Sequence, residues 1–307
     1  MCDGARGVKS TTAIPHDTTF LGKIGPLDVG AYWQLSKPRV TLLVWLSALV
    51  ALWLPGEPVS LARLVSLAVG VWLVVASANG LNETIEWRHD ARMKRTANRP
   101  IPSGRLSVWE AAAVSTLWGV VGVAVLWRLV NPLTSLLGAF SLLTYAFIYT
   151  PSKRLTPWCT VIGAVPGAIP PVMGWTAVTG SLNGEAVFLF VVQFLWQFPH
   201  FWAITWKYGS EYREAGFQMV PFHDEVGYRV GKAMLLFSVL LLLVSLTPTL
   251  LGWRSGGYAS GALLLGWWMV RSTARFVRHP DGKSAARVML ASLGYLPLWF
   301  ALLMLTR

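Results

Sequence analysis

Runs of about 20 apolar residues recur along this chain, and each is long enough to cross the hydrocarbon core of a bilayer. Of the 307 residues, 54% are hydrophobic and only 13% are charged, and the mean hydropathy is +0.51. The 17 Trp and 28 Gly residues fit helices that anchor at membrane interfaces and pack closely against one another. We therefore predict an all-α integral membrane protein, with one polytopic domain over residues 31–307 embedded in the lipid bilayer.

Nine membrane-spanning helices are predicted from these runs. The predicted spans are 39–55, 60–82, 108–128, 133–150, 157–178, 185–207, 230–251, 257–276 and 285–305. Pro151 is expected to end the fourth helix, and the long polar segments 83–107 and 208–228 follow the second and sixth. Residues 1–30 lack apolar periodicity and are expected to form a flexible tail.

The basic residues are distributed unevenly between the two predicted sides of the membrane. One side carries only four of the 26 Lys and Arg residues, namely Arg63, Arg128, Arg254 and Arg307. The positive-inside rule therefore places the N-terminus and both long polar segments in the cytoplasm. The same rule explains the net charge of +12, so a nucleic-acid partner is not expected. The N-terminal sequence is not Arg-rich, which favours a bacterial inner membrane over a mitochondrial one.

A first cluster of polar residues follows the second predicted span. Asn82, Glu86 and Asp90 are spaced four and four, so they share one face if that helix continues. Oxygen ligands of this kind suit Mg²⁺, which typically joins one or two carboxylates to substrate phosphates. Basic residues follow at once, including Arg95 and Arg99, as expected for a site that holds a metal–diphosphate. The alternative interpretation is an ordinary charged loop at the membrane surface.

A second cluster lies around the end of the sixth predicted span. Glu211, followed by Glu214, offers carboxylates on the same side of the membrane as the first cluster. His200 lies about two turns inside the apolar span, where an ionisable residue indicates a function by default. The alternative is a neutral His bonded to a carbonyl group that Pro199 leaves free. Lys207, at the end of the span, is a further candidate for substrate binding.

The fourth and fifth predicted spans contribute two more features on this side. Tyr149, Lys153 and Arg154 end the fourth span and could contact a diphosphate, although the two basic residues also fit a topology signal. Residues 163–174 interrupt the fifth span with three Gly and three Pro, a composition typical of a kink, a close helix contact or a cavity wall.

The first cluster, read as Asn82-x-x-x-Glu86-x-x-x-Asp90-x-x-Met93-x-Arg95-Thr96-x-x-Arg99-Pro100, resembles the first acidic motif of the UbiA superfamily of membrane prenyltransferases. More narrowly, it resembles the protoheme IX farnesyltransferases, or heme O synthases. The stretches that also carry this resemblance are Ser36-Lys-Pro-Arg39, Tyr149 to Arg154, Gly163 to Trp175, Pro199-His-Phe-Trp202 and Glu211 to Gly216.

The resemblance implies nine helices around a central cavity, with the polar segments forming cytoplasmic cap loops. It implies Mg²⁺-dependent transfer of farnesyl from farnesyl diphosphate to a vinyl group of heme B, which is a substrate rather than a resident cofactor. Heme A synthase or terminal-oxidase assembly proteins are the partners it implies. Two carboxylates differ from the Asp common in the family, because Glu86 and Glu211 each add a methylene group.

Residue roles carried over from the resemblance fall into two sets. Asn82, Glu86, Asp90 and Glu211 would hold the metal and so act in catalysis. Arg95, Arg99, Lys153 and Arg154 would bind the diphosphate. Further substrate-binding candidates, taken from their positions and not from the resemblance, are Tyr149, His200 and Lys207, with His200 hypothesised to contact or ligate heme.

Three alternative functions remain open from the residues alone. The first is prenyl transfer to an aromatic acid or a quinone precursor, which the acidic motifs also allow. The second is a transporter for an anionic substrate, which would account for the interrupted fifth span but predicts charges near the bilayer midplane. The third is a non-catalytic assembly protein, which would not need three oxygen-bearing side chains on one helical face.

Overall fold

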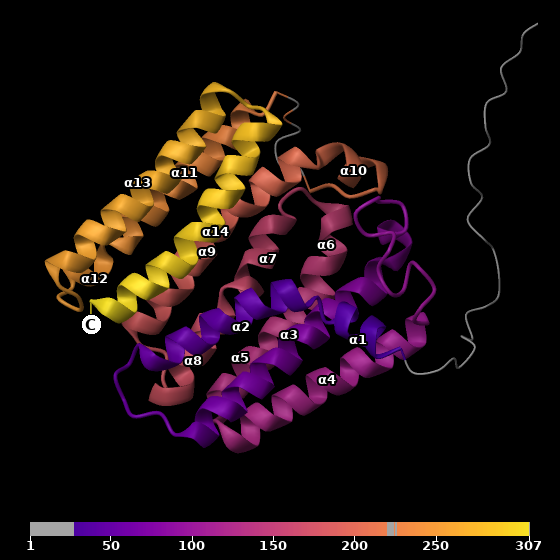
Figure 1. Ribbon diagram of the computed structural model, residues 1–307, viewed down its shortest axis with the longest axis horizontal. Helices are drawn as coiled ribbons and strands as arrows, with labels where there is room; N and C mark the ends of the chain where they lie inside the picture. Colours follow the sequence, from indigo (N-terminus) through magenta and orange to yellow (C-terminus); the bar gives the residue numbers. More distant parts are fainter. Residues whose placement is uncertain (1–27, 220–223, 225, 307) are drawn as a thin grey trace, which may run out of the picture.

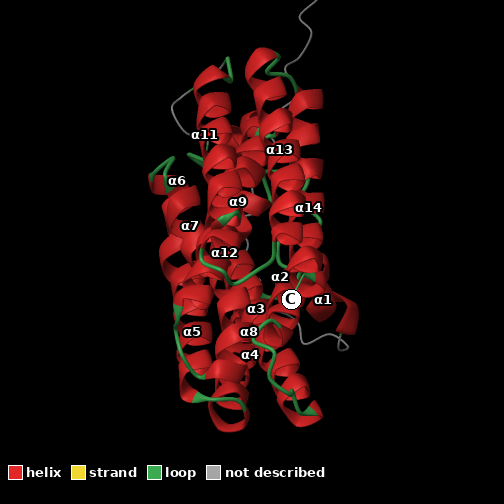
Figure 2. Ribbon diagram, turned by 90° about the vertical axis from the view of Figure 1, so that its left-hand side faces the viewer, coloured by secondary structure: helices red, strands yellow, loops and turns green. Residues whose placement is uncertain are grey.

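The computed structural model describes residues 28–219, 224 and 226–306, and all regular secondary structure in these ranges is helical (Figures 1 and 2). The elements are α1 Val29–Leu35, α2 Pro38–Trp53, α3 Leu61–Asp90, α4 Val108–Leu129, α5 Pro132–Leu143, the π-helix η1 Thr144–Tyr149, α6 Thr150–Leu155, α7 Cys159–Gly167, α8 Ile169–Thr179, α9 Gly184–Lys207, α10 Gly209–Glu214, α11 Tyr228–Ser245, α12 Thr247–Leu250, α13 Gly256–Arg278 and α14 Gly282–Leu305. Most of the predicted tail over 1–30 lies outside the described residues, and its last two residues already belong to α1.

Membrane-length apolar helices dominate the described part of the chain. Seven helices or helical runs are long and apolar enough to cross a membrane, and the bent pair α1–α2 raises the number to eight. The predicted span 257–276 is helical as α13 but is not among them, because Gly, Ser, Thr and Arg271 dilute its apolar character. A multi-pass helical membrane protein is therefore confirmed, whereas the count of nine spans is not.

The long helices lie side by side along a common direction (Figure 2). On one side of the bundle α3 packs against α4, and α2 packs against α8. On the other side α11, α13 and α14 pack together beside α9 (Figure 1). Side chains that accept backbone N–H groups fix several helix starts, at Ser60, Ser107, Asn131, Asn183 and Asp281.

Two predicted helix ends were wrong, and both corrections move polar residues onto helices. The second span does not stop at residue 82, because α3 has no Gly or Pro after Gly80 and runs on to Asp90. Pro151 does not end the fourth span either. The preceding turn widens into η1, where the Thr150 N–H bonds Tyr145 O, and the helix continues through Pro151 to Leu155.

The interruption predicted within the fifth span is confirmed. The run divides at Ala168 into α7 and α8, because Pro166 and the Pro170–Pro171 pair remove three backbone donors. The Ser141 hydroxyl donates to Pro166 O at 3.0 Å, which supplies one replacement hydrogen bond. Further along, a Cβ on Gly174 would lie only 2.0 Å from Ala48 O, so glycine lets α8 approach the backbone of α2.

Candidate active site

The last three turns of α3 carry a buried polar face at one end of the bundle. Asn82, Glu86 and Asp90 are each at most 3% exposed. The continuation of α3 to Asp90 is what aligns them, since residues four apart lie on one face of a helix. The Asn82 amide also donates to Glu86 Oε2 at 2.9 Å, so the first two members of the predicted metal set are in direct contact.

Three basic side chains, each from a different segment, meet this face. Lys37 Nζ donates to Asn82 Oδ1 at 2.7 Å from the break between α1 and α2. Lys153 Nζ on α6 donates to Glu86 Oε2 at 3.0 Å, and Arg99 donates to Asp90 Oδ2 at 2.6 Å. Each of the three oxygen-bearing side chains on α3 is therefore matched by one basic residue, and the predicted binding residues Lys153 and Arg99 lie in the same site as the predicted metal ligands.

Residues from η1 and α6 contact Lys153 and Asn82. The ammonium of Lys153 lies 4.6 Å from the centre of the Tyr149 ring, a cation–π contact. The Thr150 hydroxyl accepts from the Asn82 amide at 3.0 Å and donates to Tyr145 O at 2.9 Å. The widened turn at η1 thus places Tyr149, Thr150 and Lys153 against α3.

Lys37 holds an unfavourable backbone conformation at this site. Its φ of 49° makes it the only non-glycine residue with a positive φ in the described part of the chain. Left-handed backbone at a non-glycine residue costs of order 1–3 kcal/mol, and the surrounding structure must compensate for it.

The environment of the Lys37 side chain shifts its pKa. Burial lowers the pKa from 10.5 to about 7, and the positive charge of Arg99 lowers it as well, whereas the negative charges of Glu83 and Asp90 act in the opposite direction.

The polar segment 91–107 folds back over the end of α3. The Thr96 hydroxyl donates to Asp90 O at 2.7 Å, and the Ile101 N–H donates to Glu83 Oε1 at 3.3 Å. Glu83 is fully buried, and its other oxygen has no hydrogen-bond partner among the described residues. Glu83 lies on a different helical face from Asn82, Glu86 and Asp90, and its hydrogen bond holds the polar segment.

Contacts between the two polar segments form what we call the clasp. Its members are Arg95 and Tyr212, joined by a 2.7 Å hydrogen bond, and His89 and Ala215, joined through Nδ1 and the backbone oxygen at 2.7 Å. The Arg154 guanidinium lies 3.3 Å from the other ring nitrogen of His89. The clasp brings the predicted binding residue Arg95 to Tyr212 on α10 and places Arg154 beside His89 on α3.

Three predicted residues lie outside both the face on α3 and the clasp. Glu211 lies on α10, where one carboxylate oxygen is buried and has no hydrogen-bond partner among the described residues. Lys207 lies over the ring of its neighbour Tyr208 at 5.3 Å. His200 contacts α14, with Nδ1 2.8 Å from the Ser292 hydroxyl and its ring stacked on Trp196.

The donor set fits a metal–diphosphate better than a bare metal ion. Among the residues described, no three His, Cys, Asp or Glu side chains lie together as a ready metal site. The face on α3 supplies two carboxylates and one amide, and Glu86 Oε1 is buried without a partner among those same residues. Mg²⁺ keeps several waters and completes its shell with phosphate oxygens, so a set of this size suits it.

Several residues of the site were not predicted from the sequence. They are Lys37, His89, Thr150 and Tyr212. Pro38 signals a helix start and restricts the residue before it, which could have directed attention to Lys37. The others depend on contacts between distant segments, for which local spacing gives no signal.

An all-helical bundle with membrane-length helices and a buried acid–base face at one end fits the class of intramembrane prenyltransferases. The chain belongs to the UbiA prenyltransferase family, whose model matches residues 43–301.

Sequence comparison shows the same family, and comparison with solved structures shows the same fold. The chain is 40% identical over 286 residues to a protoheme IX farnesyltransferase from Solibacter usitatus, covering 90% of this chain and 98% of that protein. A digeranylgeranylglyceryl phosphate synthase structure superposes with a TM-score of 0.76 at 15% identity, covering 90% and 97% of the two chains. A UbiA homologue from Archaeoglobus fulgidus bound to GPP and Mg²⁺ has a TM-score of 0.65 at 15% identity, covering 89% and 99%.

Proposed function

We propose that this chain transfers a farnesyl group from farnesyl diphosphate to a vinyl group of protoheme IX, giving heme O and diphosphate. The observation that carries the proposal is the buried face on α3, where Asn82, Glu86 and Asp90 each contact one basic residue. Relatives named protoheme IX farnesyltransferase, similar over nine-tenths of the chain, support the choice of donor and acceptor.

The residues that would hold Mg²⁺ are Asn82, Glu86 and Asp90, with Glu211 from the second polar segment. When bound, the metal neutralises part of the diphosphate charge and makes diphosphate a better leaving group. One oxygen each of Glu86 and Glu211 is buried and has no hydrogen-bond partner among the described residues, which supports this role, because such oxygens are costly unless a ligand satisfies them. The GPP- and Mg²⁺-bound homologue supports a metal requirement in the family.

The basic residues would bind the diphosphate oxygens. Lys153 and Arg99 are already held at the face on α3, and Arg95 and Arg154 are held by the clasp nearby. With a metal–diphosphate bound, Lys153 and Arg99 would turn from carboxylate partners into phosphate partners, and Arg95 and Arg154 would add phosphate contacts from the clasp. Such fixed positive charges stabilise the negative charge that develops on the leaving group. Lys207 would add a further cation from the end of α9.

The reaction needs no protein nucleophile. The bond from C1 of the farnesyl group to the diphosphate oxygen breaks, and its electron pair leaves with diphosphate. The π electrons of the vinyl group then form a bond to C1, and water captures the resulting cation and loses a proton to become a hydroxyl group. Buried aromatic residues such as Tyr149 would exclude water from the allylic cation until the carbon–carbon bond has formed.

Placement of the acceptor and of the protein completes the proposal. His200 would contact or ligate heme from α9, where Ser292 and Trp196 fix its ring. The bundle end that carries the acidic site and most of the Lys and Arg residues would lie on the cytoplasmic side of a bacterial inner membrane, as the positive-inside rule predicts. Heme A synthase or oxidase assembly proteins would receive the product.

The test is an assay of the purified protein in lipid nanodiscs with heme B, farnesyl diphosphate and Mg²⁺, with heme species identified by mass. We expect a hydroxyethylfarnesyl heme that disappears with EDTA and with Asp90→Ala. Glu214→Gln is the matched control, because Glu214 is an exposed acid of the second polar segment. Farnesylation of 4-hydroxybenzoate without a heme product would overturn the acceptor, and turnover that survives EDTA would overturn the metal role.

A further inference from the structure

His89, on the last turn of α3, contacts two other segments of the chain through its two ring nitrogens. Nδ1 lies 2.7 Å from the backbone oxygen of Ala215, and Nε2 lies 3.3 Å from the Arg154 guanidinium. A carbonyl oxygen can only accept a hydrogen bond, so Nδ1 carries a proton, and a guanidinium can only donate, so Nε2 carries none. The two partners therefore select one form of the ring, the neutral imidazole with its proton on Nδ1.

The segment after α10 fixes the position of this ring. Ala215 is fully buried and caps α10, where the last carbonyl groups of a helix lack partners within the helix. The next residue, Gly216, has a φ of 87°, and a Cβ there would lie 3.6 Å from His89 Nδ1. Further on, the Gln218 N–H donates to Lys153 O at 2.7 Å. This segment thus holds both the His89 ring and the backbone of α6.

The ring keeps Arg154 beside the acidic face of α3 without neutralising it. His89 follows Glu86 by three residues, and side chains three apart are neighbours on a helix surface. Lys153 and Arg99 each form an ion pair with a carboxylate, whereas Arg154 belongs to none of the ion pairs between described residues. A neutral acceptor orients a guanidinium and leaves its charge intact. Donation to one ring nitrogen also leaves most of its five N–H groups for another acceptor.

We propose that His89 is a positioning residue for diphosphate binding, because its neutral ring holds the Arg154 guanidinium at the acidic site with its charge free for phosphate oxygens. A carboxylate in place of the ring would hold the guanidinium but cancel its charge, and an apolar side chain would not hold it. The inference rests on the proposed function, since it takes diphosphate binding at this site as given. It assigns His89 a role separate from that of the metal-binding residues beside it.

The experiment measures, by calorimetry, the binding of farnesyl thiolodiphosphate with Mg²⁺ to the intact protein in lipid nanodiscs. We expect His89→Leu to raise the Kd of this unreactive analogue about tenfold, the effect of losing one charge-assisted hydrogen bond to phosphate. His89→Gln should stay within about threefold of the wild type, because an amide keeps one donor and one acceptor. His89→Glu should bind at least as weakly as His89→Leu, because its carboxylate neutralises Arg154. Wild-type affinity in the glutamate variant would overturn the inference.

A double-variant cycle separates positioning from a purely structural role. Arg154→Leu should also weaken binding about tenfold, and adding His89→Leu to it should weaken binding no further, since no guanidinium remains to be positioned. If His89 acted only by holding the Ala215 carbonyl group, its substitution would weaken binding equally with and without Arg154. Such additive effects would overturn the inference.

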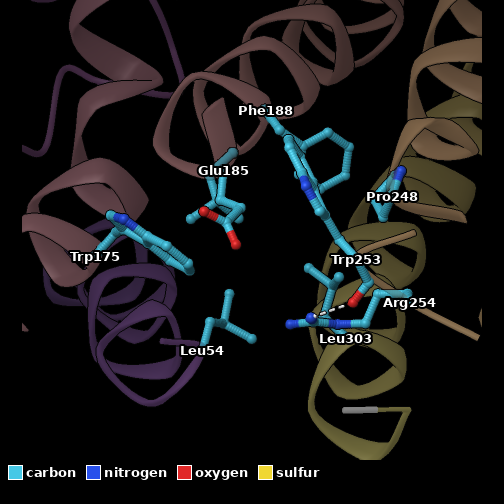
Figure 3. A pocket seen from close by; sticks show the side chains of 9 residues that line it. Leu54, Trp175, Glu185, Phe188, Pro248, Trp253, Arg254 and Leu303 are labelled. Carbon is cyan, nitrogen blue, oxygen red and sulfur yellow. Dashed lines mark hydrogen bonds between the residues drawn. The ribbon is translucent and has the colours of Figure 1, made fainter. Parts of the chain in front are cut away.

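Arg254→Leu is the matched control for Arg154→Leu. Arg254 lies near Leu54 after the end of α2, whereas Lys37 of the acidic site lies just before the start of α2. Arg254 donates there to Trp253 O at 2.8 Å, and its loss should leave the Kd unchanged (Figure 3). No binding by the wild-type protein would overturn the proposed function together with this inference. Tight wild-type binding with additive effects in the cycle would overturn this inference alone.

Discussion

Lys153 and Glu86 are joined by a 3.0 Å ion pair that connects the end of α6 to the buried face of α3. Both side chains are nearly inaccessible, at 10% and 4% exposure, so each charge depends on the other. A buried pair of this kind is costly to break, because removing one partner leaves an uncompensated charge.

Lys153→Met should destabilise the protein by about 3–5 kcal/mol, because Glu86 would lose its cation in a buried site. The double variant Lys153→Met with Glu86→Met should regain most of that stability and still be inactive. Unfolding curves in a fixed detergent measure the first effect, and the heme assay measures the second. A single variant as stable as the wild type would contradict the dependence of the two charges on one another.

Asp90→Asn should lower turnover about a hundredfold and raise the Mg²⁺ concentration needed for half-maximal activity. The amide keeps the size of the side chain but removes the charge that both Arg99 and a metal require. Turnover titrated against Mg²⁺ measures the change, and an unaltered Mg²⁺ curve would remove Asp90 from the metal site.

Binding of diphosphate should be accompanied by proton uptake at Lys37. With a pKa of about 7 in the free protein, the Lys37 amine is mostly neutral at pH 8. An anion favours the charged form and raises the pKa, so close to one proton should be taken up at pH 8 and progressively less as the pH falls through 7.

Calorimetry of diphosphate binding in buffers of different ionisation enthalpy measures this uptake. Lys37→Arg is the control. Because arginine is already charged, this variant should bind diphosphate without the proton uptake attributed to Lys37. Equal proton uptake by the wild type and this variant would contradict a neutral Lys37 in the free protein.

Glu83→Leu and Glu83→Gln should differ in how well segment 91–107 is held. Leucine leaves the Ile101 N–H without its acceptor, at a cost of about 1–3 kcal/mol, whereas glutamine still offers an oxygen. Limited proteolysis of segment 91–107 should be faster in the leucine variant only. Equal cleavage rates in the two variants would show that the hydrogen bond does not hold this segment.

Gly174→Ala should destabilise the contact between α8 and α2 by roughly 1–3 kcal/mol or more, because the new Cβ meets the Ala48 carbonyl oxygen. Gly256→Ala, at the start of α13, is the matched control, since a Cβ there meets open space. Thermal unfolding of both variants should show a lower midpoint for Gly174→Ala alone.

Much of the fold could be predicted from the sequence because lipid imposes length and hydropathy on each span. The polar face of α3 could be predicted as well, since the spacing of Asn82, Glu86 and Asp90 needs only a continuous helix. Local rules were less reliable where tertiary context decides. Pro151 sits inside a helix because η1 widens the preceding turn, and α10 is too short and polar to stand out from a loop.

The contacts that join distant segments of the chain at the site could not be predicted from the sequence. Lys37 reaches Asn82 only because α1 and α2 bend by 54° at a residue with positive φ, and a sequence gives no signal for that angle. Glu211 and the face on α3 were predicted as one metal set, and that grouping stays a prediction.

The clasp joins parts of the chain that are 117 and 126 residues apart, from Arg95 to Tyr212 and from His89 to Ala215. Neither polar segment can open without giving up hydrogen bonds to the other, so the two behave as one cooperative unit. A ligand that orders the segment after α3 therefore lowers the entropic cost of ordering the segment around α10. Occupancy at one acidic motif should raise the affinity of the other, with a single coupling free energy that is the same whichever motif is filled first.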